Sequence, residues 1–241
     1  MKAAAFELAR PKTIAEASAL LSRPGARALA GGQSLGPMLN LRLVRPTLLV
    51  QLSAIAALHD VEETADAVTI GACVTHAAIA DGLVPDIGQN VLARVAEGIA
   101  YRAVRNRGTI GGSLCHADPA ADWLTTLTAL GAEAITSLSR TLPMPAFVRG
   151  AFQTALRPGE LLLAVRIPRL GADARWGYVK TCRKPGEFAH AMAAVLIDPA
   201  KSIRRAVIGA TGTAPRALDN GAAPPGLHGV VLRRALAEAS A

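Results

Sequence analysis

The sequence predicts an α+β fold with more than one domain. Three observations favour it: strand-like apolar runs alternate with helical segments, two of the runs lead into paired glycines, and the composition changes at residues 169–173. With 241 residues, 51% of them hydrophobic, the chain is long enough to bury a sizeable core. We therefore expect a first domain over 1–170, with subdomains of about 1–55 and 56–170, and a second domain over 171–241.

The first 55 residues predict a small unit of strands and helices. Thr13 and Glu16 form a capping box, so a helix is expected to begin near residue 13. A proline and a glycine at 24–25 end this helix. Residues 27–30 and 47–52 predict strands, and the first of these leads into a glycine loop. The resulting order is typical of a small α+β subdomain.

The middle of the chain continues the alternation. Residues 68–72 predict a strand, and Thr75 is placed to cap a short helix that runs through Ile79. Residues 91–100 carry apolar side chains at helical spacing, and a basic stretch at 102–107 follows. This stretch opens into the second glycine loop.

The last part predicts two more helices and several strands. Asp118 before Pro119 predicts an N-cap and a first helical residue, and the buried helix is expected to continue over 123–130. A strand at 161–168 ends in proline. The second domain is expected to contain strands at 176–182, 189–197 and 203–210, a loop at 221–226 and a closing helix at 230–239.

Composition and charge exclude several classes of function. The net charge of +8 suits an acidic partner or an anionic ligand. Aromatic residues make up only 3% of the chain, and the basic residues are not clustered in the sequence or along one helix face. Both observations disfavour a nucleic-acid-binding protein. No apolar run approaches the roughly 20 residues of a membrane span. Three scattered cysteines (Cys73, Cys115 and Cys182) predict no metal site and suit reduced thiols in the cytoplasm.

Two glycine loops carry the strongest functional signal. Paired glycines let a backbone approach a ligand closely, and successive N–H groups form a concave site for anions. Two such loops, far apart in the sequence, predict one pyrophosphate held from two sides, and hence a dinucleotide; the alternative is a pair of ordinary turns. The candidate contacts are Ala30, Gly31, Gly32, Gln33, Ser34 and Leu35 in the first loop, and Thr109, Ile110, Gly111, Gly112 and Ser113 in the second.

The hydroxyl groups in these loops have two interpretations. Ser34 and Thr109 can donate to a ligand, or they can cap the backbone locally. His116, Asp118 and Cys115 follow the second loop. We interpret His116 as a ligand contact, Asp118 chiefly as a cap that also lies within reach of the ligand, and Cys115 as a small packed residue.

Five segments resemble a known family. Residues 30–42 and 105–112 are similar to the FAD-binding medium subunit of molybdenum hydroxylases, of the carbon monoxide dehydrogenase, xanthine dehydrogenase and quinoline oxidoreductase type. Residues 118–122, 158–162 together with 166–168, and 180–189 match the same family. The matches follow one another in order over nearly the whole chain, which makes the resemblance specific.

The resemblance implies a fold, a cofactor and partners. The fold would be a two-subdomain FAD-binding fold of the vanillyl-alcohol-oxidase type plus a small α+β C-terminal domain. The chain would carry FAD in a dimer of heterotrimers with an iron–sulfur small subunit and a molybdopterin large subunit. Electrons would pass from [2Fe–2S] clusters to this FAD and on to an external acceptor.

Two alternatives to this function stay open. A stand-alone FAD-dependent reductase of the same fold would need its own acid and substrate pocket, and the sequence shows no clear set. A non-enzymatic interaction subunit that has lost the cofactor is the other alternative, and the intact glycine loops argue against it.

The resemblance also assigns roles to single residues. Asp122 would accept hydrogen bonds from the ribityl hydroxyls, although it could also complement a helix dipole. Lys180 would lie near the flavin ring and Phe188 over it; the alternatives are a solvated lysine and an ordinary core phenylalanine. Arg27 would reach the FAD from the strand before the first loop, and Leu162 lies in a matching segment.

The chain departs from the family pattern at two places. Ser113 and His116 stand where many relatives have asparagines, so polar contacts there are expected to differ. Residues 215–228 replace a longer segment, which shortens the C-terminal domain.

Overall fold

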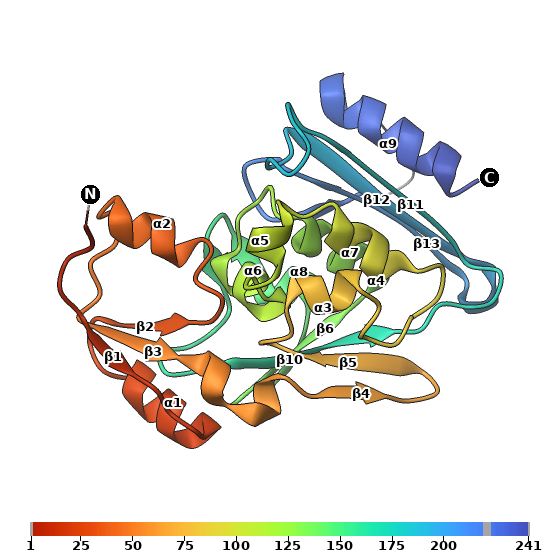
Figure 1. Cartoon of the computed structure of the whole chain (residues 1–241). Helices are drawn as coiled ribbons and strands as arrows, with labels where there is room; N and C mark the ends of the chain where they lie inside the picture. Colours follow the sequence, from red (N-terminus) through yellow and green to blue (C-terminus); the bar gives the residue numbers. More distant parts are fainter. Residues whose placement is uncertain (1, 219–222, 241) are drawn as a thin grey trace.

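The computed structural model describes residues 2–218 and 223–240. Its first elements are β1 (Glu7–Ala9), α1 (Ile14–Leu21), β2 (Ala26–Leu29), α2 (Leu35–Asn40) and β3 (Leu48–Gln51). The strands form a parallel sheet in the order β1-β3-β2. Parallel strands need crossover connections, and the two helices supply them on opposite faces of the sheet (Figure 1).

A five-stranded antiparallel sheet forms the centre of the molecule. Its strands are β4 (Val61–Glu63), β5 (Ala67–Gly71), β6 (Glu133–Thr136), β7 (Thr141–Pro143) and β10 (Leu162–Pro168), in the order β4-β5-β10-β6-β7. Helices lie over one face of it (Figure 1): α3 (His76–Ala80), α4 (Val91–Glu97), α5 (Arg102–Arg105), α6 (Ile110–His116) and α7 (Asp122–Leu130). Smaller elements are η1 (Leu52–Ala54), η2 (Ala56–Leu58), α8 (Met144–Phe147), β8 (Val148–Gly150) and β9 (Gln153–Thr154).

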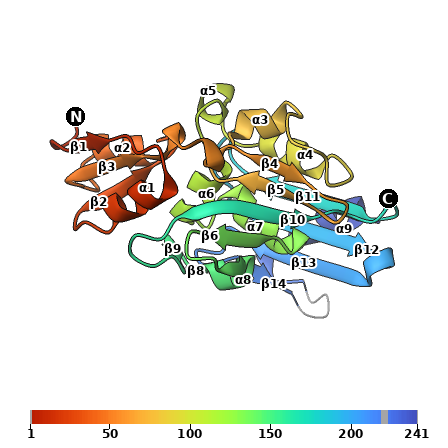
Figure 2. The same cartoon turned by 90° about the horizontal axis from the view of Figure 1, so that it is seen from below.

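A third sheet packs on helix α7. Its strands are β11 (Arg175–Thr181), β12 (Ala191–Asp198), β13 (Ile203–Gly209) and β14 (Arg216–Ala217), in sequence order, with η3 (Pro199–Lys201) after β12 and α9 (Gly226–Glu238) on the outer face. All nine residues of α7 are buried. Figure 2 shows the first sheet at one end of the molecule and the third sheet at the other. Helix α7 therefore lies between the central and the third sheet.

Close contacts hold this third sheet in place. The Arg205 guanidinium of β13 donates to the carbonyl of Ala129 at 2.7 Å, where it faces the negative end of the α7 dipole. A Cβ on Gly209 would lie 1.9 Å from the Thr125 hydroxyl, so only glycine allows the strand to lie this close to the helix. The sheet and helix form one packed unit.

Most of the predicted elements are confirmed. Thr13 accepts from the N–H of Glu16 at 3.2 Å, and Thr75 accepts from the N–H of Ala78 at 3.1 Å. The predicted buried helix is α7, and the strands expected at 161–168 and 203–210 are β10 and β13. Hydrophobic periodicity and capping residues were sufficient for these elements because their signals are local.

Four local predictions were wrong. Asp118 does not cap a helix: its carboxylate accepts from the N–H of Ala120 at 2.9 Å in an Asx turn, and α7 begins only at Asp122. The helix expected over 91–100 ends at Glu97, because Gly98 follows it. The second glycine loop is the first turn of α6.

The fourth correction concerns the chain end. The closing helix α9 begins at Gly226, four residues before the predicted start at 230. Part of the loop expected at 221–226 lies outside the described residues. None of the helices in the described ranges is both long and apolar enough to span a membrane.

Candidate cofactor-binding site

The two glycine segments meet in space. A Cβ on Gly31 would lie 1.8 Å from the carbonyl oxygen of Arg107 and 2.9 Å from the Cα of Gly108. A Cβ on Gly112 would lie 3.7 Å from the Cβ of Ala30. Contact at 1.8 Å is impossible for any larger residue, so Gly31 is what lets the first loop reach the second segment. The segments were predicted to face a common ligand, and they are neighbours.

The first loop has free amide donors. Within the described part of the chain, no hydrogen bond engages the backbone N–H groups of residues 31–34. Gly32 has φ +70°, and a Cβ there would meet only a methyl group of Leu29, at 3.2 Å. The Ser34 side chain makes no capping bond at the start of α2, so its hydroxyl is available. Successive free N–H groups of this kind suit an anionic ligand.

The second segment uses its donors within the protein. Thr109 caps α6 by accepting from the N–H of Gly112 at 3.0 Å, which supports the capping interpretation of this hydroxyl. The N–H of Gly111 donates to Ala72, where an added Cβ would lie 2.6 Å from the carbonyl oxygen. The amides of Ile110 and Ser113 donate to Val74 and Thr109. This segment is therefore closely packed, and the backbone N–H groups without a partner belong to the first loop.

A buried histidine is hydrogen-bonded to the residue that precedes the second segment. The backbone N–H of His76 donates to the carbonyl of Gly108 at 2.9 Å, and its Nδ1 accepts from the indole of Trp123 at 3.1 Å. Burial and, to a smaller extent, the charge of Arg105 lower the pKa of His76 from 6.5 to about 4. The imidazole is therefore neutral at pH 7. His76 carries no motif in the sequence that predicts this role.

We expect His76 to make stability depend on pH. The pKa of His76 is about 4 in the folded protein, below its ordinary value of 6.5. The neutral imidazole therefore contributes fully to the free energy of unfolding above pH 6.5, and this contribution is lost as the pH falls toward 4. The shift corresponds to about 3 kcal/mol of unfolding free energy. Urea unfolding at pH 7 and pH 4.5 should show a smaller loss in His76→Gln than in wild type. His59→Gln, at an exposed site, is the control; an equal loss in all three proteins would contradict this assignment.

A partly buried ion pair joins the third sheet to α7. Nζ of Lys180 on β11 donates to the Asp122 carboxylate at 2.6 Å and to the Gly98 carbonyl at 2.7 Å. The hydroxyl of Tyr178 donates to the same Asp122 oxygen at 2.7 Å. Burial and the adjacent carboxylate hold the pKa of Tyr178 well above 10, so this hydroxyl stays protonated. Lys180 is thus not a solvated surface lysine.

The segment after Gly98 is held by a second cation. Arg105 donates from Nη1 to the carbonyls of Ile99 and Ala100, at 2.9 and 3.0 Å. These bonds fix Ala100 at φ +43°, a conformation that non-glycine residues rarely adopt. A Cβ on Gly186 would lie 3.0 Å from the Ala100 carbonyl oxygen, so the loop that carries Phe188 packs here. Three consecutive carbonyls therefore face two cations.

The remaining predicted cofactor contacts lie on several different elements. Phe188 is 60% exposed, which excludes a core role. Arg27 is exposed on β2, and His116 is the last residue of α6. Leu162 is buried at the start of β10, beneath the helices. Sequence analysis missed Tyr178, although the two-residue period of a strand places it on the same face as Lys180.

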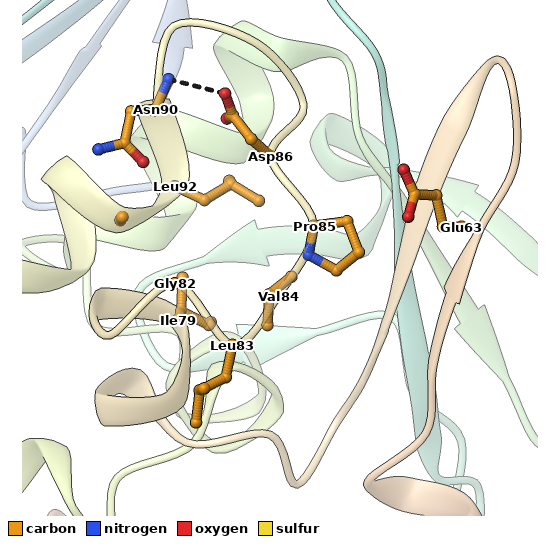
Figure 3. A pocket seen from close by; sticks show the side chains of 10 residues that line it. Glu63, Ile79, Gly82, Leu83, Val84, Pro85, Asp86, Asn90 and Leu92 are labelled. Carbon is orange, nitrogen blue, oxygen red and sulfur yellow. Dashed lines mark hydrogen bonds between the residues drawn. The ribbon is translucent and has the colours of Figure 1, made fainter.

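A hollow elsewhere on the surface does not fit an anionic cofactor. It has a volume of about 520 Å³ and lies between α3, α4 and β4 (Figure 3). Glu63 and Asp86 line it, and Asp86 accepts from the N–H of Asn90 at 3.2 Å. Carboxylates disfavour a phosphate group, and none of the predicted contacts lines this hollow.

Comparison with known proteins decides the family. Residues 4–170 match the FAD binding domain in molybdopterin dehydrogenase. The chain belongs to this family. The predicted family is therefore confirmed, and FAD is the cofactor of this domain.

Two named relatives of this chain support the family assignment. The chain is 36% identical over 229 residues to the nicotine 6-hydroxylase medium subunit of Paenarthrobacter nicotinovorans, covering 91% of this chain and 80% of that one. It is 34% identical over 219 residues to the carbon monoxide dehydrogenase medium chain of Hydrogenophaga pseudoflava, covering 88% and 76%. The chain is thus an FAD-binding medium subunit of an oxidoreductase complex of the molybdenum hydroxylase type.

Solved structures confirm the fold of the FAD-binding family. The carbon monoxide dehydrogenase of Hydrogenophaga pseudoflava lacking the Mo-pyranopterin moiety matches with a TM-score of 0.90 and 29% identity, over 100% of this chain and 99% of that one. The quinoline 2-oxidoreductase of Pseudomonas putida 86 matches with a TM-score of 0.89 and 30% identity, over 100% and 98%.

Proposed function

We propose that this chain carries electrons through FAD, from [2Fe–2S] clusters of an iron–sulfur small subunit to an external acceptor. A molybdopterin large subunit would oxidise the organic substrate, and the three chains would form a dimer of heterotrimers in the cytoplasm. The relatives support this proposal because they are medium subunits of hydroxylases and dehydrogenases. A reducing compartment would keep the free thiols of Cys73, Cys115 and Cys182 reduced.

The observation that carries the proposal is the contact between the two glycine segments. Residues 31–34 have unpaired N–H groups and lie against residues 107–112, an arrangement that supports a pyrophosphate site here. We propose that Gly32, Gln33 and Ser34 donate to it, with the hydroxyl of Ser34 as a further donor. Gly31, Gly111 and Gly112 keep the walls close enough for this contact.

Other residues would position the flavin ring and the ribityl chain of the cofactor. Bound FAD supplies redox chemistry in one- and two-electron steps, and the protein supplies position and potential. We propose that Lys180, Phe188 and the 98–101 segment surround the flavin end. One oxygen of Asp122 accepts from Lys180 and Tyr178, so the carboxylate would neutralise Lys180. The other oxygen would accept from the ribityl chain.

Purification from the native source tests this function. The chain is expected to bring down two further polypeptides, and the preparation should contain FAD, iron and molybdenum. Free FAD released by acid should match the chain in a one-to-one ratio. A catalytically complete flavoprotein without iron or molybdenum would support the stand-alone reductase instead. Absence of flavin from the native complex would contradict both functions.

A further inference from the structure

Two donors meet at one oxygen of the Asp122 carboxylate. Nζ of Lys180 lies 2.6 Å from Oδ1, and the hydroxyl of Tyr178 lies 2.7 Å from the same atom. The Asp122 side chain is only 10% exposed. Within the described residues its other oxygen, Oδ2, takes no hydrogen bond and is open to solvent. A carboxylate that is nine-tenths buried thus keeps one acceptor oxygen for a ligand.

The hydroxyl of Tyr178 is committed to this carboxylate. In the described part of the chain its one other polar contact is the Met192 thioether, 3.9 Å away, which is a weak acceptor. An O–H donor bonds more strongly to an ionised acceptor than to a neutral one. Burial and the charge of Asp122 hold the pKa of Tyr178 well above 10, so the hydroxyl keeps its proton at neutral pH.

Helix α9 fixes the place of Tyr178 from the outer side of the third sheet. Gly177 and Tyr178 are neighbours on β11, so they face opposite sides of the sheet. A Cβ on Gly177 would lie 1.9 Å from the Ala235 carbonyl oxygen, so α9 packs directly on the strand. The backbone N–H of Tyr178 donates to the Glu238 carboxylate of α9 at 3.0 Å. The helix therefore holds the strand whose other face carries the Tyr178 hydroxyl.

The two donors differ in how firmly they orient Asp122. Lys180 carries three N–H donors on a flexible stem, so it can follow the carboxylate through several orientations. The phenol ring of Tyr178 is rigid and has a single hydroxyl. Tyr178 is therefore the donor that keeps Oδ1 turned toward β11 and leaves Oδ2 without a partner.

We propose that Tyr178 is a positioning residue of the cofactor site, whose hydroxyl orients the Asp122 carboxylate so that Oδ2 accepts from a hydroxyl of the ribityl chain. This inference rests on the proposed function, because it assumes that the ribityl chain of FAD lies at Asp122. The third sheet then has a role of its own: through β11 it supplies both donors that hold this side chain of α7.

The FAD affinity of the deflavinated full chain tests the role of the hydroxyl. Tyr178→Phe keeps the ring and removes the O–H, so we expect FAD binding to weaken about ten-fold. In an Asp122→Ala background the same change should have less than about a two-fold effect, because no carboxylate is left to orient. Thr126→Val is the matched control. It removes a buried hydroxyl of α7 that has no hydrogen-bond partner among the described residues, and it should bind FAD as wild type does.

The ionisation of Tyr178 reports its contact with Asp122 without FAD. The chain has two tyrosines, so Tyr101→Phe leaves Tyr178 as the one source of tyrosinate absorption. In this background we expect Asp122→Asn to lower the pKa of Tyr178, because the negative charge beside the hydroxyl is removed. A spectroscopic pH titration of the full chain measures the shift, and far-UV circular dichroism shows that the chain is still folded.

The outcomes separate this inference from the proposed function. Unchanged FAD affinity in Tyr178→Phe, with normal thermal unfolding, overturns the role of Tyr178 and leaves FAD binding intact. An equal loss in the wild-type and Asp122→Ala backgrounds also overturns it, because Tyr178 would then act without Asp122. A tyrosinate titration that Asp122→Asn leaves unchanged overturns it too. A wild-type chain that binds no FAD overturns both proposals.

Discussion

Gly31→Ala is expected to abolish FAD retention. The added methyl group would lie 1.8 Å from the Arg107 carbonyl oxygen, a backbone atom that cannot rotate away. The first loop must then move off the second segment, and the space for the pyrophosphate opens. FAD content per chain, measured by absorption after gel filtration, is the readout.

Gly36→Ala is the matched control for this variant. Gly36 lies in α2, a few residues after the loop, and a Cβ there has nothing within 4 Å. Alanine favours a helix by about 1 kcal/mol over glycine, so this variant should keep its FAD and unfold at the same or a higher temperature. Normal FAD content in Gly31→Ala would show that contact between the segments is not needed for binding.

Breaking the Lys180–Asp122 pair is expected to shift the flavin reduction potential in opposite directions. Lys180→Met removes a cation and leaves a carboxylate uncompensated, which disfavours added electrons and lowers the potential. Asp122→Asn leaves the Lys180 charge uncompensated and raises it. Interactions of about 1–3 kcal/mol correspond to roughly 20–65 mV for a two-electron couple. Redox titration resolves such shifts.

The double variant and a distant lysine complete this experiment. Lys180→Met combined with Asp122→Asn should restore a potential near that of wild type, because the two changes cancel in charge. Lys12→Met, at an exposed site before α1, removes one positive charge elsewhere and should leave the potential unchanged. Unchanged potentials in both single variants, with FAD fully bound, would place the pair away from the flavin ring.

The sequence predicted the glycine segments but not how each one is used. Close approach to a ligand and close approach to another backbone both require a residue without Cβ, so the pattern cannot separate them. Gly31 and Gly111 pack against backbone atoms, whereas Gly32 remains open. Only the tertiary contact between loop and helix distinguishes these roles.

The polar network at α7 shows the same limit. Lys180 and Asp122 were identified separately as contacts of one cofactor, yet they bind each other across 58 positions of sequence. Their pairing depends on how the third sheet packs on α7, which no local pattern encodes. Asp118 failed as a helix cap for a related reason, because the Asx turn to Ala120 competes with a cap at the same residue.

The most direct test is an experimental structure of the flavin-containing protein. The pyrophosphate of FAD is expected within hydrogen-bond distance of the N–H groups of Gly32, Gln33 and Ser34, facing the Thr109–Gly112 turn. An ordered FAD whose phosphates lie elsewhere, with the N–H groups of residues 31–34 bound only to water, would contradict the assigned site.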